Sequence, residues 1–172
     1  MFLNYIKSFI LKKSLRKLLC NVKAETLNCP VTKVGLIVDE SCFLETTALK
    51  REIISNGIAE SNIKVIVYRD ILKSKAVYAE PTFGIKDLNF KNEFANPALK
   101  DFLSEEFDLL INYYNKEKPF LLLLTHNAKA KFKIGFSTVD KRLNHLLINI
   151  EPENYKGFIQ ELFRYLKILN KI

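Results

Sequence analysis

Glycine is scarce in this sequence, and the glycines that it has lie far apart. Only five of the 172 residues are glycine, and no two are close enough to form G-x-G-x-x-G or a P-loop. Such loops hold the phosphate groups of bound nucleotides in common enzyme families. The sequence therefore argues against a dinucleotide or nucleoside triphosphate enzyme of the usual type, and we expect no cofactor.

Cysteine is also rare and shows no metal-binding spacing. The three cysteines, Cys20, Cys29 and Cys42, form neither a C-x-x-C motif nor a set of cysteine and histidine ligands. Cys20 follows two leucines, as in a lipoprotein signal, but a small residue should precede a lipidated cysteine. Four basic residues at positions 12, 13, 16 and 17 also interrupt the apolar stretch. We expect a reduced, cytoplasmic protein without a secretion signal.

Long hydrophobic runs are absent as well. The longest, residues 120–124, is far shorter than the roughly 20 residues that a transmembrane helix needs. Hydrophobic residues nevertheless make up 48% of the chain and aromatic residues 12%, which is enough to bury a sizeable core. The length fits one domain, or one domain with an appended helix.

Positive charge is present in excess and is concentrated in two segments. The net charge is +8, of which residues 1–23 supply +6 with no acidic residue. Residues 124–145 add +4, whereas the segment between them carries −3 and the tail from residue 146 carries +1. Clustered cations favour polyanionic partners, either nucleic acid or an anionic membrane surface.

The first basic segment has the pattern of an amphipathic helix. Apolar residues between positions 2 and 22 recur at three- and four-residue steps, as a helix requires. Its polar face carries five candidate polyanion-binding residues: Lys7, Lys12, Lys13, Arg16 and Lys17. The alternatives are that this helix packs on the domain with its lysines in solvent, docks on RNA, or lies on a membrane.

The rest of the chain predicts one α/β domain. Residues 24–32 have the character of a linker, and the domain spans residues 33–172. Apolar or alternating runs predict strands at 34–38, 63–68, 107–114, 131–136 and 146–150. Helices are expected at 43–55, 96–106, 119–128 and from Pro152 onward. Residues 70–95 have no readable pattern apart from a short strand expected near 87–90.

The order of these elements determines the fold class. Strands that alternate with helices predict a Rossmann-like three-layer sandwich with about five mainly parallel strands. In such a sheet, ligands bind beyond the carboxyl ends of the strands. The residues that follow the predicted strands are Asp39, Glu40 and Ser41 after the first, Arg69 and Asp70 after the second, and 112–115 after the third. Of these, Asp39, Glu40, Ser41, Asn112 and Asn115 form the expected ligand pocket.

Several of these residues have a plainer interpretation. Asp39 and Glu40 could act as an acid–base or metal-binding pair, but adjacent carboxylates at a strand end also serve as turn and helix-cap residues. His126 and His145 have no metal partner at i+3 or i+4, which favours structural or surface roles. Cys42 has no recognisable base, so we expect a buried, unreactive thiol. We therefore predict no metal and no catalytic residue.

The second basic segment contains a run of lysines with strand period. Lys129, Lys131 and Lys133 should share one face of a strand. With Lys141 and Arg142 they could form a lysine strip that binds polyanions. The alternative is an exposed edge strand whose lysines prevent aggregation.

Two resemblances accompany these patterns. The segments FDLLINYY, AKAKFKIGF and DKRLN, followed by an amphipathic helix, resemble a family of small Bacteroidota proteins known only as a domain of unknown function. Residues 107–136 alone resemble the acceptor domain of heptosyltransferase-like glycosyltransferases. Those enzymes need a second domain to bind the nucleotide sugar, and VDESCF lacks their glycine-containing loop. The resemblance implies the fold more than the reaction.

Together these observations favour a binding protein over an enzyme. We expect it to engage RNA or a ribonucleoprotein through the basic helix and the lysine strip, with weak sequence selectivity. One alternative is a protein anchored peripherally to the inner membrane by the same helix, and another is a small or degenerate glycosyltransferase-like enzyme.

Overall fold

The computed structural model describes residues 30–73, 76–88 and 94–172. The amphipathic helix expected over residues 2–22 lies outside these ranges. Within them the expected α/β sandwich is confirmed, with six strands in one fully parallel sheet instead of about five. No helix in the described ranges is long and apolar enough to cross a membrane.

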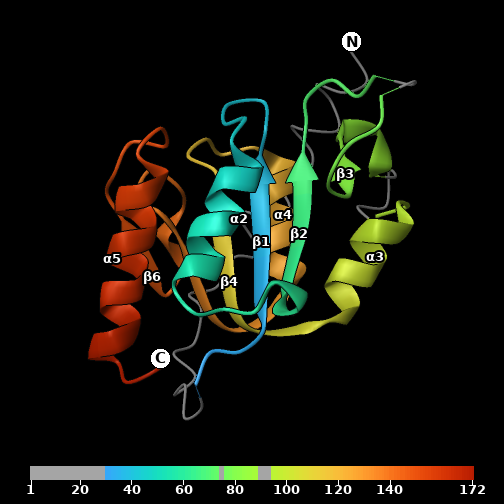
Figure 1. Ribbon diagram of the computed structural model, residues 1–172. Coiled ribbons are helices and arrows are strands. Elements are labelled where there is room, and N and C mark those ends of the chain that lie inside the picture. Colours follow the sequence, from blue (N-terminus) through green and yellow to red (C-terminus); the bar gives the residue numbers. More distant parts are fainter. Residues whose placement is uncertain (1–29, 74–75, 89–93) are drawn as a thin grey trace.

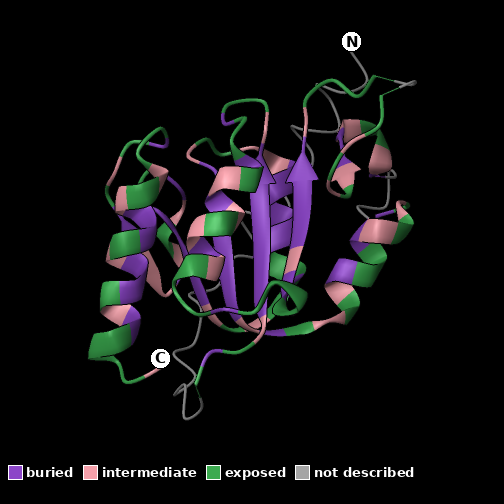
Figure 2. Cartoon of the chain, in the orientation of Figure 1, coloured by how far each residue is buried: buried purple, intermediate pink, exposed green. Residues whose placement is uncertain are grey.

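The sheet has the order β3-β2-β1-β4-β5-β6 (Figure 1). Its strands are β1 (Val34–Asp39), β2 (Ile63–Tyr68), β3 (Thr82–Phe83), β4 (Glu106–Tyr113), β5 (Lys129–Phe136) and β6 (Leu146–Ile148). The strands β1 and β4 lie at the centre, and all six residues of β1 are buried. Figure 2 shows this buried centre with exposed residues on the outer sides of the helices. Burial on both faces explains why these strands are continuous apolar runs.

Helices cover both faces of the sheet. They are α2 (Thr46–Ser55), α3 (Pro97–Ser104), α4 (Pro119–Asn127) and α5 (Tyr155–Ile168). Apolar residues of α2 and α5 share a core cluster with one face of the sheet, and those of α3 and α4 share a second cluster with the other face. Residues 120–125 of α4 are all buried. Its apolar side chains pack in one cluster with residues of the sheet and with Val139 and Leu143, which follow β5. A helix enclosed in this way is apolar all round.

Local chemistry explains where several elements begin. Asn96 is the N-cap of α3, its side chain accepts a hydrogen bond from the Ala98 amide at 2.9 Å, and Pro97 occupies the first turn, as predicted. The short strand expected near residues 87–90 lies partly outside the described residues. Of the described ones, Leu88 forms an isolated antiparallel bridge with Phe94, and the strand of this segment that joins the sheet is Thr82–Phe83. A 3₁₀ turn at Ile85–Asp87 follows it, and the Asp87 carboxylate accepts a hydrogen bond from the Gly84 amide at 2.8 Å.

The strand order reverses its direction at β1. The strands β2 and β3 lie to one side of β1, and β4, β5 and β6 lie to the other. The chain leaves β1 toward α2 on one face of the sheet and leaves β4 toward α4 on the other face. In open parallel sheets such a switch point, at the carboxyl ends of the strands, is where ligands usually bind.

Candidate functional site

Polar side chains gather at the carboxyl edge of the sheet in two separate groups. One group, the Lys118 cluster, consists of Asp39, Ser41, Asp70 and Lys118 and occupies the switch point itself. The other surrounds a cavity beside the first turn of α2, which we call the Glu40 cavity.

The Lys118 cluster joins three segments of the chain. Asp39, at the end of β1, is only 3% exposed, and its Oδ2 atom lies 2.8 Å from Lys118 Nζ. The same ammonium lies 2.8 Å from Asp70 Oδ2 and 4.9 Å from the centre of the Tyr68 ring. Ser41 completes the cluster, because its hydroxyl accepts a hydrogen bond from the Asp70 amide at 2.9 Å. These contacts fill the switch point with protein groups.

Within this cluster, Lys118 and Asp70 hold each other in the ionised form. Burial by itself would lower the pKa of Lys118, but its hydrogen bonds to Asp39 and Asp70 outweigh burial, so the pKa is raised. Burial would raise the pKa of Asp70, yet hydrogen bonds from Lys118 and Tyr68 bring it below its usual value. Neither group is tuned to exchange a proton near neutral pH. The cluster therefore has the character of a structural ion network, not of an acid–base pair.

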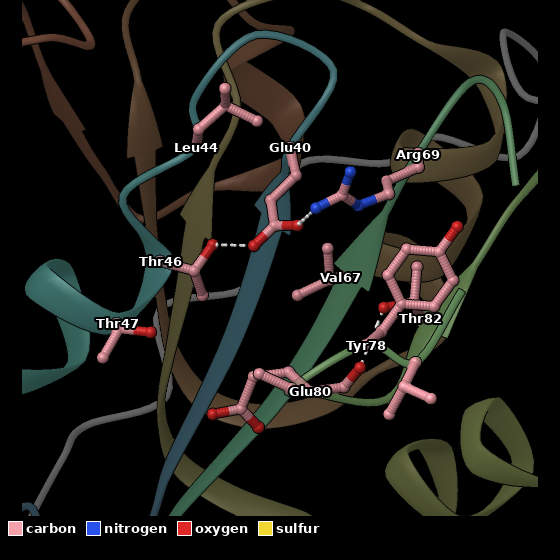
Figure 3. A pocket seen from close by; sticks show the side chains of 11 residues that line it. Glu40, Leu44, Thr46, Thr47, Val67, Arg69, Tyr78, Glu80 and Thr82 are labelled. Atoms are coloured by element: carbon pink, nitrogen blue, oxygen red, sulfur yellow. Dashed lines mark hydrogen bonds and ion pairs between the residues drawn. The ribbon is translucent and has the colours of Figure 1, made fainter. Parts of the chain in front are cut away.

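The Glu40 cavity has a volume of about 220 Å³. Glu40 and Arg69 form an ion pair at one end of it, with Glu40 Oε2 2.5 Å from Arg69 Nη2 (Figure 3). The Thr46 hydroxyl donates to the other oxygen of Glu40 at 2.5 Å. The Arg69 guanidinium also lies 5.0 Å from the centre of the Tyr78 ring. The polar residues that line the cavity are Glu40, Thr46, Thr47, Arg69, Tyr78, Glu80 and Thr82.

The residues of the expected ligand pocket do not form one pocket. Glu40 lines the cavity, whereas Asp39 and Ser41 belong to the Lys118 cluster. Asn112 is 1% exposed beneath α4, where its amide donates to Asn144 Oδ1 at 2.7 Å and its Oδ1 accepts from the Thr125 hydroxyl at 3.0 Å. The backbone carbonyl of Asn115 accepts from the Thr138 hydroxyl at 2.9 Å.

Lys133 is the main correction to the lysine strip. Its side chain is only 7% exposed, and its Nζ atom donates to the carbonyl oxygen of Thr125 in the last turn of α4 at 2.7 Å. Burial lowers the pKa of Lys133 to about 8. Lys133 shares a strand face with Lys129 and Lys131, as predicted, but the end of α4 covers its position. It therefore caps a helix and cannot contact a polyanion at the surface.

The remaining residues of the lysine strip divide into paired and unpaired ones. Lys131 Nζ lies 2.7 Å from Asp108 Oδ1, and Arg142 Nη2 lies 2.6 Å from Asp140 Oδ2. Lys129 and Lys141 are exposed and form no ion pair with other described residues. The exposed cationic surface of this segment is smaller than the sequence pattern predicts.

The remaining candidate residues, Cys42, His126 and His145, do not form a catalytic or metal-binding group with other described residues. Cys42 is exposed, which contradicts the buried thiol expected there. His126 is exposed beside Asn127, and His145 Nδ1 accepts a hydrogen bond from the Lys133 amide at 2.8 Å. In the described ranges, no three His, Cys, Asp or Glu side chains are grouped so that they could hold a metal ion.

Several residues of these two groups were not predicted from the sequence, among them Lys118, Thr46, Tyr78 and Glu80. Lys118 comes directly before Pro119, after the central strand, so the strand-end rule could have indicated it. Thr46 is the first residue of α2, and Tyr78 and Glu80 lie in the segment without a readable pattern. No local signal in that segment shows that its residues close a cavity against α2.

Comparison with known proteins gives the family but no activity. A family of unknown function (DUF6913) matches residues 7–169, and the chain belongs to this family. No curated protein and no solved structure shows a significant match to this chain.

We predict that Lys118→Met destabilises the fold by about 3–5 kcal/mol, because it leaves the buried Asp39 carboxylate without its cation. Urea denaturation of the purified variants measures this loss. Arg164→Met removes an exposed i,i+3 pair with Glu161 and should change stability by less than about 0.5 kcal/mol.

The double variant Asp39→Asn/Lys118→Met tests the cause of this loss. It removes the uncompensated charge, so it should be more stable than Lys118→Met alone. If Lys118→Met costs no more than the Arg164 control, the Asp39 charge does not depend on Lys118.

We predict a rise in stability with pH that comes from Lys133. Its pKa is about 8 in the folded protein and ordinary in the unfolded chain, so above pH 8 the unfolded chain binds more protons. The free energy of unfolding should therefore rise by up to about 2 kcal/mol between pH 8 and about 9.5. Lys133→Met should lack this rise, and Lys129→Met, an exposed lysine on the same strand, should keep it. Equal pH profiles for wild type and Lys133→Met would contradict the assignment.

Proposed function

We propose that this member of family DUF6913 is a non-enzymatic binding protein that engages a polyanion, RNA or a ribonucleoprotein, mainly through residues 1–23. The observation that carries the proposal is the distribution of charge. Residues 1–23 supply +6 of the net charge of +8, and residues 30–172 together carry only +3, since Glu25 subtracts one. A concentration of unopposed cations is the electrostatic footprint of phosphate binding.

The ion pairs of the domain support this division. Eight of its basic residues lie within ion-pair distance of carboxylates: Lys33, Lys50, Lys64, Arg69, Lys118, Lys131, Arg142 and Arg164. A cation already paired with a protein carboxylate attracts a phosphate less than an unpaired one. Within the lysine strip, Lys129 and Lys141 are exposed and form no such pair with other described residues, so they are the residues of the strip that could add phosphate contacts.

A peripheral membrane protein is the second candidate. The observation that favours it is the spacing of apolar residues between positions 2 and 22, which would let one helix face enter a lipid headgroup layer. A glycosyltransferase-like enzyme has weaker support. The resemblance over residues 107–136 suggests it, but Asn112 at the carboxyl end of β4 is buried and hydrogen-bonded to Asn144 and Thr125. For the RNA function we place the protein in the cytoplasm of a bacterium, and for the membrane function at the inner membrane.

Salt dependence tests the RNA proposal. We expect the affinity for a fluorescein-labelled single-stranded RNA to fall steeply with KCl, with a log–log slope of up to about −4 if six phosphates are neutralised. Replacing five cations of residues 1–23 with Gln should reduce the slope to about −1. The replaced residues are Lys7, Lys12, Lys13, Arg16 and Lys17. Fluorescence anisotropy measures both.

Lys64→Gln is the matched control for this experiment. Lys64 pairs with Asp101 and Glu105 in the domain, so its replacement should leave the slope unchanged. A flat salt dependence of the wild type would refute the RNA proposal. Flotation with anionic phosphatidylserine vesicles that requires the same five cations, without RNA binding, would favour the membrane function instead.

A further inference from the structure

The Glu40 cavity contains a hydrogen-bond donor without an acceptor. Arg69 Nε is buried and has no hydrogen-bond partner among the described residues, although Nη2 of the same guanidinium is paired with Glu40. A buried donor left without an acceptor costs free energy, and such groups are rare in folded proteins. In Figure 3 this guanidinium lies at one end of the cavity, between Glu40 and Tyr78. A ligand that supplies an acceptor atom here would therefore satisfy the Arg69 Nε donor.

Two apolar side chains that line the cavity are exposed to solvent. Leu44 and Val77 contribute to its lining, and they are 74% and 99% exposed. They are two of the few large hydrophobic side chains exposed on the described surface, and both lie at this cavity. Exposed apolar groups around a polar interior are typical of a binding site.

The charge balance around the cavity argues against an anionic ligand. Arg69 is neutralised by Glu40, and Lys50 lies between two carboxylates, 3.3 Å from Glu80 and 3.2 Å from Glu60. Carboxylates thus outnumber cations around the cavity, so a phosphate or carboxylate would meet repulsion. A neutral ligand with both an acceptor and a donor fits better, because carboxylate oxygens can accept further hydrogen bonds.

The volume limits the size of the ligand. About 220 Å³ lies below the range of about 300–1,000 Å³ that is usual for drug-sized ligands. The cavity has room for one planar heterocycle of one or two fused rings, not for a dinucleotide. Such a heterocycle can also contact the exposed side chains of Leu44 and Val77.

We propose that the Glu40 cavity binds one neutral planar heterocycle, of one or two fused rings, with a cis-amide edge, in which a carbonyl oxygen lies beside an N–H group. The carbonyl accepts from Arg69 Nε, and the N–H donates to the Glu40 carboxylate. Guanine and uracil carry this edge, whereas adenine and cytosine present an unprotonated ring nitrogen beside an amino group. The heterocycle can be that of a free nucleoside or a base of a single-stranded RNA. Only the RNA source rests on the function proposed above.

Titration of the full-length protein with four nucleosides tests this proposal without any variant. By isothermal titration calorimetry, we expect guanosine or uridine to bind in a saturable manner, and adenosine and cytidine to bind at least about tenfold more weakly. No binding of guanosine or uridine, or equal binding of all four nucleosides, would overturn it.

Arg69→Lys tests the residue assignment. It keeps the positive charge beside Glu40 but removes the Nε donor, so guanosine or uridine should bind at least about tenfold more weakly. Arg142→Lys, which changes an arginine paired with Asp140 outside the cavity, should bind like the wild type. Arg69→Lys binding as tightly as the wild type would show that the ligand lies elsewhere.

A competition experiment shows whether the bound heterocycle is a base of an RNA strand or a free nucleoside. Competition of an oligo(U) or oligo(G) strand, but not oligo(A), with the bound nucleoside would indicate an RNA base. Nucleoside binding without such competition would indicate a free ligand. The variant with five Gln replacements in residues 1–23 should keep nucleoside binding, so failure of the cavity and failure of polyanion binding are separate results.

Discussion

A buried carboxylate is costly unless a cation compensates its charge, and in this fold the buried carboxylate is Asp39, at the end of the central strand β1. Lys118, in the connection between β4 and α4, supplies that cation and also binds Asp70 after β2. The ion pairs therefore fix the loops after β1 and β2 and the start of α4 relative to one another. They also occupy the switch point with carboxylates, where dinucleotide-binding folds of the same strand order place a glycine-rich loop and a phosphate. The strand order alone would suggest a nucleotide enzyme, but the side chains at this point repel phosphate.

A second buried polar layer lies beneath α4, and its members depend on one another. Asn112, Thr125 and Asn144 are linked by hydrogen bonds, and the Lys133 ammonium donates to the carbonyl of Thr125. A side chain at position 135 would collide with this layer, since a Cβ atom there would lie 2.7 Å from Asn144 Nδ2. Glycine at this position is therefore required by a close approach, not by a turn. Polar groups of this kind bond in few ways, so they favour one arrangement of β4, β5 and α4.

Much of the fold follows from the sequence because the periodicity of apolar residues reports directly on burial. The runs in β1 and β2 are apolar at all but one position, and residues 109–111 in the middle of β4 are apolar and buried, as is typical of strands covered on both faces. Periodicity gives the face of a residue but not what covers it, so it could not distinguish Lys133 from Lys129. The burial of Lys133 depends on where α4 ends. Asp39 pairs with Lys118, 79 residues further along the chain, and Glu40 pairs with Arg69, 29 residues further along. Contacts over such separations have no local signal.

The distribution of ion pairs also bears on where the proposed partners could bind. The charged side chains of the Lys118 cluster and of the Glu40–Arg69 pair form ion pairs within the domain. This part of the carboxyl edge therefore offers a partner mainly hydrogen-bonding groups and exposed apolar side chains. Such a surface discriminates by shape and by donor–acceptor pattern, and its binding should depend weakly on salt. The unopposed cations of residues 1–23 have the opposite properties, because attraction to phosphates has a long range, is screened by salt and reads little sequence. The two parts of the chain are therefore suited to different tasks, and a base-selective cavity would supply the selectivity that a purely electrostatic contact lacks.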